Sequence, residues 1–289
     1  MQHFPFRTRA FLACGDGMAR GETLVGREGA HSASEYTSGC RARAQARWRL
    51  LGLLIIGASA APALAQGLAD LTPGGSLAVT SDYIYRGVSD SGGDPAAQVD
   101  LHARTMGGTY FGVWSSTRDN DLEPYADADL ELYFGHRFDL STDWGVTLEG
   151  RAHYYLGGNQ PVNDDYQQVS ATLTYLDRWT LSVTAIPNAV RYWYDRRLGR
   201  TPAWAADTAG QWLLFEGFFV TGSAGYYYST ATGPGIGAAA GYGYGSVGFA
   251  YEYRRWRLDV GYFATQDKAR QLFPYPITNR VAGTLAWRF

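Results

Sequence analysis

The ten residues RVAGTLAWRF, at positions 280–289, decide the fold class. Leu285 and Trp287 fall on one face of this stretch and Arg280 and Arg288 on the other, because the pattern has a period of two. Successive side chains of a β-strand point to opposite sides, so alternation of this kind predicts a strand with one apolar and one polar face.

The same alternation recurs from residue 76 onward, for example at 126–134, 144–154 and 256–265. Aromatic residues gather near the ends of these segments, and the connections between segments alternate between long and short. Both features are typical of outer-membrane barrels, which have aromatic girdles, long external loops and short periplasmic turns. We therefore predict an all-β, transmembrane, antiparallel up-and-down barrel with both termini on the periplasmic side. Its twelve strands are expected at 76–86, 97–105, 109–116, 125–138, 144–156, 166–176, 179–190, 204–215, 218–228, 237–252, 256–265 and 278–289.

Composition agrees with this class and excludes several others. The 289 residues are 46% hydrophobic and 15% aromatic, yet the mean hydropathy is only -0.24. A barrel has this average hydropathy because half of each strand faces a polar lumen. No uncharged apolar run reaches the roughly 18 residues of a membrane-spanning helix. The near balance of 25 basic and 27 acidic residues argues against a nucleic-acid-binding protein.

The N-terminal part has the features of an export signal. Arginines between residues 41 and 49 precede a short apolar run, and the small residues Ala63 and Ala65 then form a cleavage site. We predict an extension at 1–40 that is mis-annotated or disordered, a signal peptide at 41–65 and the barrel at 66–289. Both cysteines precede the cleavage site, so the exported part contains no disulfide.

The start of the predicted barrel reads LAVTSDYIYRGVS at 77–89 and DPAAQ at 94–98. This resembles the first segment of the TorF family of porins. The segments YFGVW at 110–114 and DLELY at 129–133 are similar to that family as well. The resemblance covers residues 76–289, with its specific part in the first three or four strands, and it implies a Gram-negative outer-membrane barrel with a pore role.

The charged residues on the polar faces are expected to line the lumen, because a charge near the midplane of the lipid face costs about 2–4 kcal/mol. Seven are acidic and seven basic: Asp82, Asp100, Asp127, Asp129, Glu131, Glu149 and Asp259, and Arg86, Arg104, Arg137, Arg151, Arg257, Arg280 and Arg288. In one interpretation, an acidic wall on the 125–138 strand faces arginines across the lumen and sets selectivity. In the other, the charges pair across strands and fill a narrow barrel.

Asp82 and Arg86 are expected on one face of the first strand. They form either part of a constriction or a structural pair with Asp100 or Arg104 on the neighbouring strand. The basic stretch from Arg191 to Pro202 is expected in an external loop. There it either attracts anionic solutes and lipopolysaccharide phosphates or is a solvated loop tip.

No catalytic site, cofactor or metal site is predicted. The histidines after residue 65 are His102, His136 and His153, and none has the Ser or Asp arrangement of an enzymatic barrel. Asp100 and His102 converge on one face, but a hydrogen-bonded lumen histidine is the favoured interpretation over a metal ligand.

We therefore expect a porin for passive diffusion of small hydrophilic solutes through a narrow, charge-balanced lumen. Twelve strands lie between the filled eight-stranded barrels and the open 16–18-stranded ones. The alternative is a closed structural or adhesive barrel that acts through its loops. Leu285, Trp287 and Phe289 look like an outer-membrane assembly signal, so the expected partners are the barrel-assembly machinery, outer-membrane lipid, lipopolysaccharide and small solutes.

Overall fold

The computed structural model describes residues 71–119, 126–157, 164–193, 196–230, 239–273 and 279–289. The predicted extension, signal peptide and cleavage site at Ala63 and Ala65 lie outside these residues. Within them, no helix has both the length and the apolar character needed to cross a membrane.

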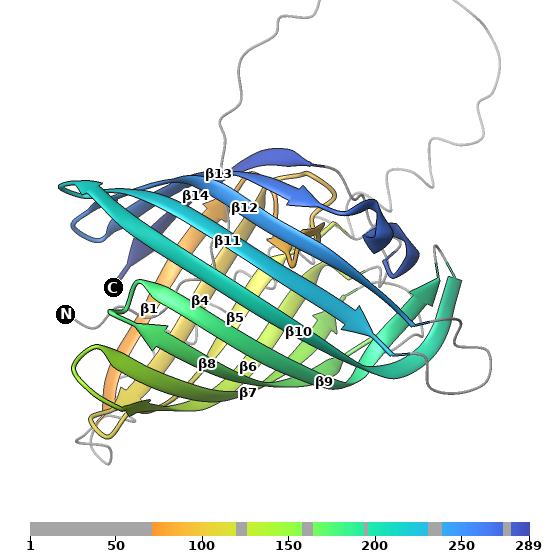
Figure 1. The fold of residues 1–289 in the computed structure, drawn as a ribbon, viewed down its shortest axis with the longest axis horizontal. Helices are drawn as coiled ribbons and strands as arrows, with labels where there is room; N and C mark the ends of the chain where they lie inside the picture. Colours follow the sequence, from red (N-terminus) through yellow and green to blue (C-terminus); the bar gives the residue numbers. More distant parts are fainter. Residues whose placement is uncertain (1–70, 120–125, 158–163, 194–195, 231–238, 274–278) are drawn as a thin grey trace, which may run out of the picture. The chain divides into compact units, whose positions relative to one another are not determined.

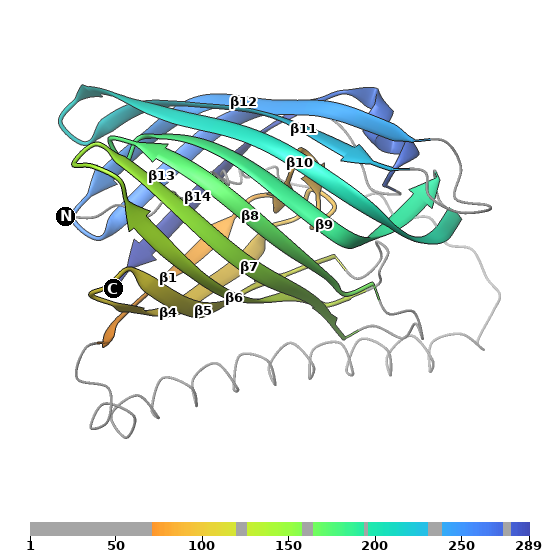
Figure 2. The same ribbon diagram turned by 60° about the horizontal axis from the view of Figure 1, so that its bottom comes forward.

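Twelve antiparallel strands close into a barrel (Figures 1 and 2), in the order β1-β14-β13-β12-β11-β10-β9-β8-β7-β6-β5-β4. The predicted fold class is therefore confirmed. The barrel strands are β1 (Leu71–Thr80), β4 (Ala96–Thr105), β5 (Thr109–Thr117), β6 (Ala128–Asp139), β7 (Trp144–Leu156), β8 (Tyr166–Tyr175), β9 (Trp179–Trp193), β10 (Arg196–Phe215), β11 (Phe218–Ser229), β12 (Ala240–Tyr253), β13 (Trp256–Thr265) and β14 (Arg280–Arg288). A separate hairpin consists of β2 (Ile84–Tyr85) and β3 (Val88–Ser89), and a 3₁₀-helix, η1 (Asp267–Gln271), precedes β14.

The sequence pattern explains most of the strand bounds. The predicted strands at 144–156 and 256–265 coincide with β7 and β13. The short connections after β4 and β10 contain Gly108 and Gly217, whose φ angles of 93° and 75° favour glycine. Closure of the barrel brings the start of β1 beside the end of β14, where Gly75 and Phe289 exchange backbone hydrogen bonds. The short connections lie at this same end of the barrel, because the strands are antiparallel and follow one another in the wall.

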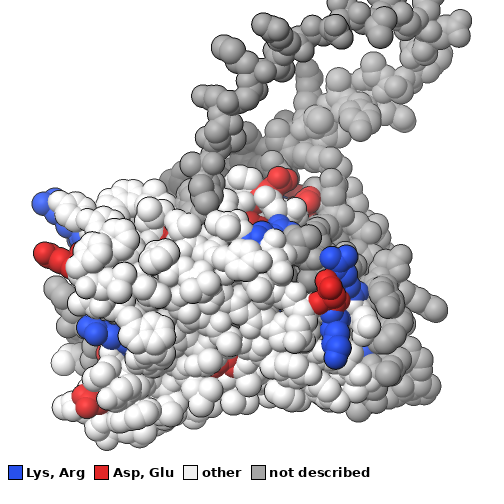
Figure 3. Space-filling model, turned by 45° about the horizontal axis from the view of Figure 1, so that its top comes forward, with Lys and Arg blue, Asp and Glu red and all other residues white. Residues whose placement is uncertain are grey.

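The outer surface of the barrel is apolar between its two ends. In Figure 3, the charged side chains of the visible face gather mainly near those ends. Every second residue of a strand points outward, so the alternation seen in the sequence becomes a continuous apolar surface. Its large exposed side chains include Leu77, Val79, Phe111, Leu132, Phe134, Leu148, Val169, Leu181, Val183, Val247, Phe249 and Val281.

The predicted long basic loop at 191–203 is wrong. β9 and β10 continue through most of this range and leave only two residues between them. Arg191 is 1% exposed, Arg197 donates from Nε to the Asp164 carboxylate at 2.7 Å, and Arg200 donates to two backbone carbonyl oxygens. Arg197 and Arg200 therefore bind groups of the same chain, and two paired strands occupy most of the range in which the loop was predicted.

The first predicted strand, 76–86, is wrong beyond its fifth residue. β1 ends at Thr80, where it pairs with both β14 and β4. The chain then leaves the wall and returns at Ala96. We call residues 81–95 the inward segment; it contains the β2–β3 hairpin, drawn in orange inside the barrel in Figures 1 and 2.

Candidate functional site

The inward segment turns back on itself at Arg86 and Gly87, which have positive φ angles of 48° and 77°. A Cβ atom on Gly87 would lie 2.2 Å from Oγ1 of Thr265 and 2.7 Å from Cβ of Tyr244. Glycine is therefore needed here both for its backbone angle and for its close approach to β12 and β13. The turn of the hairpin rests directly against the barrel wall.

The inward segment is bonded to opposite sides of the barrel. On one side, the Tyr83 hydroxyl donates to Oδ2 of Asp129 on β6 at 2.7 Å. On the other side, Tyr242 on β12 donates to the carbonyl oxygen of Arg86 at 3.1 Å. In the strand order, β6 and β12 are separated by five strands in either direction around the barrel. The segment therefore crosses the lumen and narrows it.

Asp82 anchors the start of the inward segment. Its carboxylate accepts hydrogen bonds from the hydroxyls of Ser89 and Ser91, at 2.6 and 3.1 Å, and from the Arg280 guanidinium at 2.6 Å. Asp82 is buried, and a buried carboxylate needs such partners to remain ionised. The predicted pairing of Asp82 or Arg86 with Asp100 or Arg104 is wrong, because the chain leaves the wall before both residues.

Arg86 lies on the far side of the segment, where its guanidinium donates to Oε1 of Gln168 on β8 at 3.3 Å. Burial lowers the pKa of Arg86, but Tyr85, Tyr244 and Asp207 together raise it by more, and the net shift is upward. The guanidinium therefore stays positively charged in the lumen. The acceptor of this hydrogen bond is a neutral amide, and within the part of the chain that the structure describes Arg86 forms no direct ion pair.

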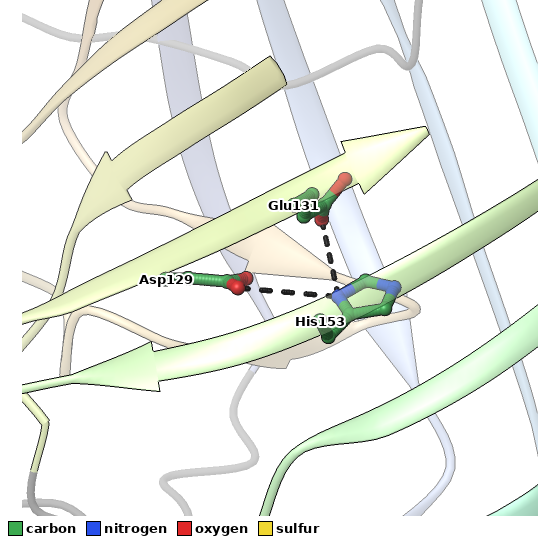
Figure 4. A group of neighbouring side chains, drawn as sticks. All are labelled: Asp129, Glu131 and His153. Carbon is green, nitrogen blue, oxygen red and sulfur yellow. Dashed lines mark ion pairs between the residues drawn. The ribbon is translucent and has the colours of Figure 1, made fainter. Parts of the chain in front are cut away.

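The predicted acidic wall on β6 is present, but its charges are not open to the lumen. Glu131 is 0% exposed and Asp129 is 2% exposed. Arg151 on β7 donates to Glu131 and also to Glu149, the latter at 2.9 Å. His153, also on β7, completes this group, and Figure 4 shows its ring directed toward Asp129 and Glu131. The arrangement agrees with the interpretation in which lumen charges pair across strands.

A second charged group lies at the end with the short connections. Arg257 binds both carboxylate oxygens of Asp259 at 2.7 Å and one oxygen of Glu252 at 2.7 Å, and Arg288 approaches Glu252 at 3.3 Å. These residues belong to β12, β13 and β14, so the group joins three neighbouring strands across the inner face.

Three other predicted lumen residues are half-buried. Asp100 accepts a hydrogen bond from the Tyr133 hydroxyl at 2.8 Å and lies 2.6 Å from Nδ1 of His102. Arg104 lies on β4, on the same face as Asp100, and Asp127 lies directly before β6.

An aromatic cavity beside the inward segment was missed by sequence reasoning. It has a volume of about 70 Å³, and its lining includes Tyr85, Arg86, Tyr166, Tyr227, Tyr242 and Phe273. Tyr166, Tyr227 and Tyr242 come from three different strands, and Tyr85 and Arg86 come from the inward segment. The alternation could have placed the wall tyrosines on the inner face, but it carried no sign of the segment that completes the cavity.

Part of the chain matches a protein family, and several solved porin structures are similar to it at low identity. Residues 65–199 match a family described as "Bacterial protein of unknown function (Gcw_chp)". No curated protein sequence matches the chain. Among solved structures, a NanC porin is 10% identical with a TM-score of 0.48, over 74% of this chain and 98% of that one. A KdgM porin described in complex with disordered oligogalacturonate is 5% identical with a TM-score of 0.44, over 75% and 98%. OmpF of Salmonella typhi, described in complex with daunomycin, is 10% identical with a TM-score of 0.44, over 76% and 97%. At these scores the likenesses carry no weight for a substrate, and the architecture rests on the strand pairing itself.

Proposed function

We propose that this protein is an outer-membrane channel for passive diffusion of small hydrophilic solutes, narrowed by the inward segment. The observation that carries the proposal is a closed barrel with an apolar outer surface and a polar inner face that a folded connection crosses. Only a closed barrel or a helix satisfies all backbone hydrogen bonds inside a bilayer, so this surface fits a membrane-spanning wall. The similarity of residues 77–98 to the TorF porins supports the same function.

The orientation and partners follow from the same proposal. The end with the short connections faces the periplasm, as in other bacterial barrels. The start of β1 and the end of β14 lie at this same end. Leu285 and Phe289 are exposed on the apolar outer face, and Trp287 lies between them on the same side of β14, where the assembly machinery can recognise them. The outer face contacts lipid, and the connections at the other end contact lipopolysaccharide.

Arg86 makes weak anion preference the expected selectivity. Asp90 and Asp164 also line the aromatic cavity, but each lies within ion-pair distance of an arginine, Arg118 at 3.4 Å and Arg197 at 2.7 Å. Among the residues that line the cavity, Arg86 therefore contributes a surplus positive charge. This supports small neutral or anionic solutes over cations.

Single-channel conductance in planar bilayers tests the channel. The wild-type chain is compared with a variant in which residues 82–94 are replaced by a Gly-Ser linker. Thr80 and Ala96 are paired in the wall, so a linker between them leaves the barrel strands in place. A matched control carries Gly-Ser residues in the short connection at 140–143. We expect small conductance steps for the wild type and the control, and larger steps for the linker variant.

Each other outcome rejects part of the proposal. Equal conductance of the wild type and the linker variant would show that the inward segment is not the constriction. Silence of both folded proteins would reject a channel. A wild type without conductance and a linker variant with conductance would favour the closed structural barrel. The hydrogen bonds that join the inward segment to β6 and to β12 are the observation that supports this alternative.

A further inference from the structure

The geometry points to a divalent transition-metal site formed by Asp129, Glu131 and His153, which we propose as a second functional feature of the barrel. One potential ligand atom from each residue lies within 4.8 Å of the others, and all three side chains are buried. Figure 4 shows the two carboxylates and the imidazole directed toward a common point.

The strand pairing builds this group. Asp129 and Glu131 are two residues apart on β6 and therefore share one face of the strand. Glu131 is directly opposite His153 in the β6–β7 register. The His153 ring stacks on Tyr166 with 4.1 Å between ring centres and 11° between planes, which fixes its orientation. The site thus lies on the rigid wall and not on a loop.

The distances fit a shared ion better than direct hydrogen bonds. Nδ1 of His153 is 3.3 Å from Oε1 of Glu131 and 3.9 Å from Oδ1 of Asp129. A charge-assisted hydrogen bond between such groups is about 2.7–2.9 Å long. Two ligands about 2.1 Å from a tetrahedral zinc ion are about 3.4 Å apart, which the 3.3 Å separation matches and the 3.9 Å separation approaches. Oδ1 of Asp129 is fully buried and accepts no hydrogen bond within the described residues, so one ligand oxygen is directed at this point without a donor.

The charges point to a cation as well. Asp129, Glu131 and Glu149 contribute three carboxylates, Arg151 contributes one positive charge, and Arg118 is paired with Asp90. With a neutral imidazole, the carboxylates of this group outnumber its guanidinium, and buried charges are strongly unfavourable unless they are compensated. A divalent ion supplies the missing charge. One imidazole nitrogen with two carboxylate oxygens suits a borderline ion such as Zn²⁺ better than Mg²⁺ or Ca²⁺, which prefer oxygen alone.

An ion at this site would also hold the inward segment. The other oxygen of Asp129, Oδ2, accepts the hydrogen bond from Tyr83 at 2.7 Å. Fixing the Asp129 carboxylate between the ion and Tyr83 connects β6, β7 and the constriction. Metal occupancy would therefore influence how firmly the segment is held across the lumen.

Zinc titration of the chelator-treated full chain, by isothermal titration calorimetry and by metal content after gel filtration, tests the site. We expect one Zn²⁺ per chain, no comparable binding of Mg²⁺, and an absorption spectrum typical of tetrahedral nitrogen and oxygen ligands after loading with Co²⁺. His153→Gln should weaken zinc binding by about 100-fold or more, beyond the 10–100-fold effect of losing an outer hydrogen-bond partner of a ligand.

His102→Gln is the matched control, because His102 also lies 2.6 Å from a carboxylate, that of Asp100, but is half-buried and does not belong to the three-residue group. It should bind zinc as the wild type does. If His153→Gln does not fold, Asp129→Asn serves as the second ligand variant, and the wild-type Co²⁺ spectrum needs no variant. The proposal is overturned if the folded wild type binds no stoichiometric zinc, or if His102→Gln weakens binding as much as His153→Gln. None of these measurements depends on conductance, so failure of the channel proposal leaves this test intact.

Discussion

Removal of the Arg280 guanidinium should release the inward segment from the wall. In the structure, Arg280 donates to Asp82 at 2.6 Å, and the Asp82 side chain is 4% exposed. Taking one partner from a buried ion pair typically costs about 3–5 kcal/mol, because the remaining charge is uncompensated. Asp82 keeps its hydrogen bonds from Ser89 and Ser91, so the lower value of about 3 kcal/mol applies here. Because about 1.4 kcal/mol corresponds to a tenfold change in an equilibrium constant, Arg280→Gln should increase opening of the segment about 100-fold.

Hydrogen exchange measured by mass spectrometry reports this opening directly. The amides of Tyr83, Asp90 and Gly93 donate hydrogen bonds within the inward segment, and their protection should fall by about two orders of magnitude. Exchange in the β7 and β13 strands should change little, because the wall does not depend on this pair. Arg270→Gln removes a positive charge from an exposed surface position and is the control.

A double variant separates charge from packing. Asp82→Asn combined with Arg280→Gln leaves no uncompensated carboxylate, so part of the lost protection should return. Unchanged exchange in Arg280→Gln would refute the reasoning, since the pair would then contribute nothing to holding the segment. Equal loss in the single and double variants would show that packing of the long side chain, and not charge compensation, is responsible.

Three further predictions concern the turn, the cavity and the outer face. Gly87→Ala should destabilise the hairpin by about 1–3 kcal/mol in the same exchange experiment. Gly199→Ala is the control, because Gly199 also has a positive φ but an added Cβ would meet no atom within 4 Å, so only its own strand should be affected. Arg86→Gln should shift the reversal potential in a salt gradient toward cation preference, and an unchanged potential would contradict a role for this charge in selectivity. Leu132→Arg, on the outer face of β6, should reduce folding stability in lipid vesicles by about 2–4 kcal/mol, whereas Leu140→Arg, in a short connection, should have an effect of about 0–1 kcal/mol.

The barrel wall could be predicted because the alternation that defines each strand is visible within a short stretch of sequence. A strand that is apolar on one side and polar on the other shows itself through period two, and this pattern placed β7 and β13 at their observed bounds. The short connections were predicted from the short gaps between alternating segments, and Gly217, with its positive φ, lies in one of them. The extension of β9 and β10 was missed because the arginines there suggested solvent, whereas partners such as Asp164 come from a distant connection. Period two assigns a face to a residue but does not assign a partner.

The inward segment and the Asp129–Glu131–His153 group both depend on which residues become partners, and the period of two does not reveal this. Residues 81–86 continue the alternation of β1, and only contacts with β6, β8, β12, β13 and β14 favour leaving the wall. In the β6–β7 hairpin, closing the predicted strands directly would place His153 opposite Asp129, whereas the observed register places it opposite Glu131. A shift of two residues therefore changes which carboxylate the imidazole faces while leaving every residue on its predicted side.

The pairing of acidic with basic residues on the inner face has a physical reason that bears on function. A lumen narrowed by a folded connection offers little water, so each charge needs a nearby opposite charge or a hydrogen-bonding partner. Arg151, Arg257 and Arg280 each meet this requirement by binding carboxylates on their own or neighbouring elements. Selectivity then depends on charges outside these pairs. Arg86 is such a charge, because it donates its hydrogen bond to a neutral amide and lies on the aromatic cavity, so we expect its guanidinium to set the selectivity of that cavity.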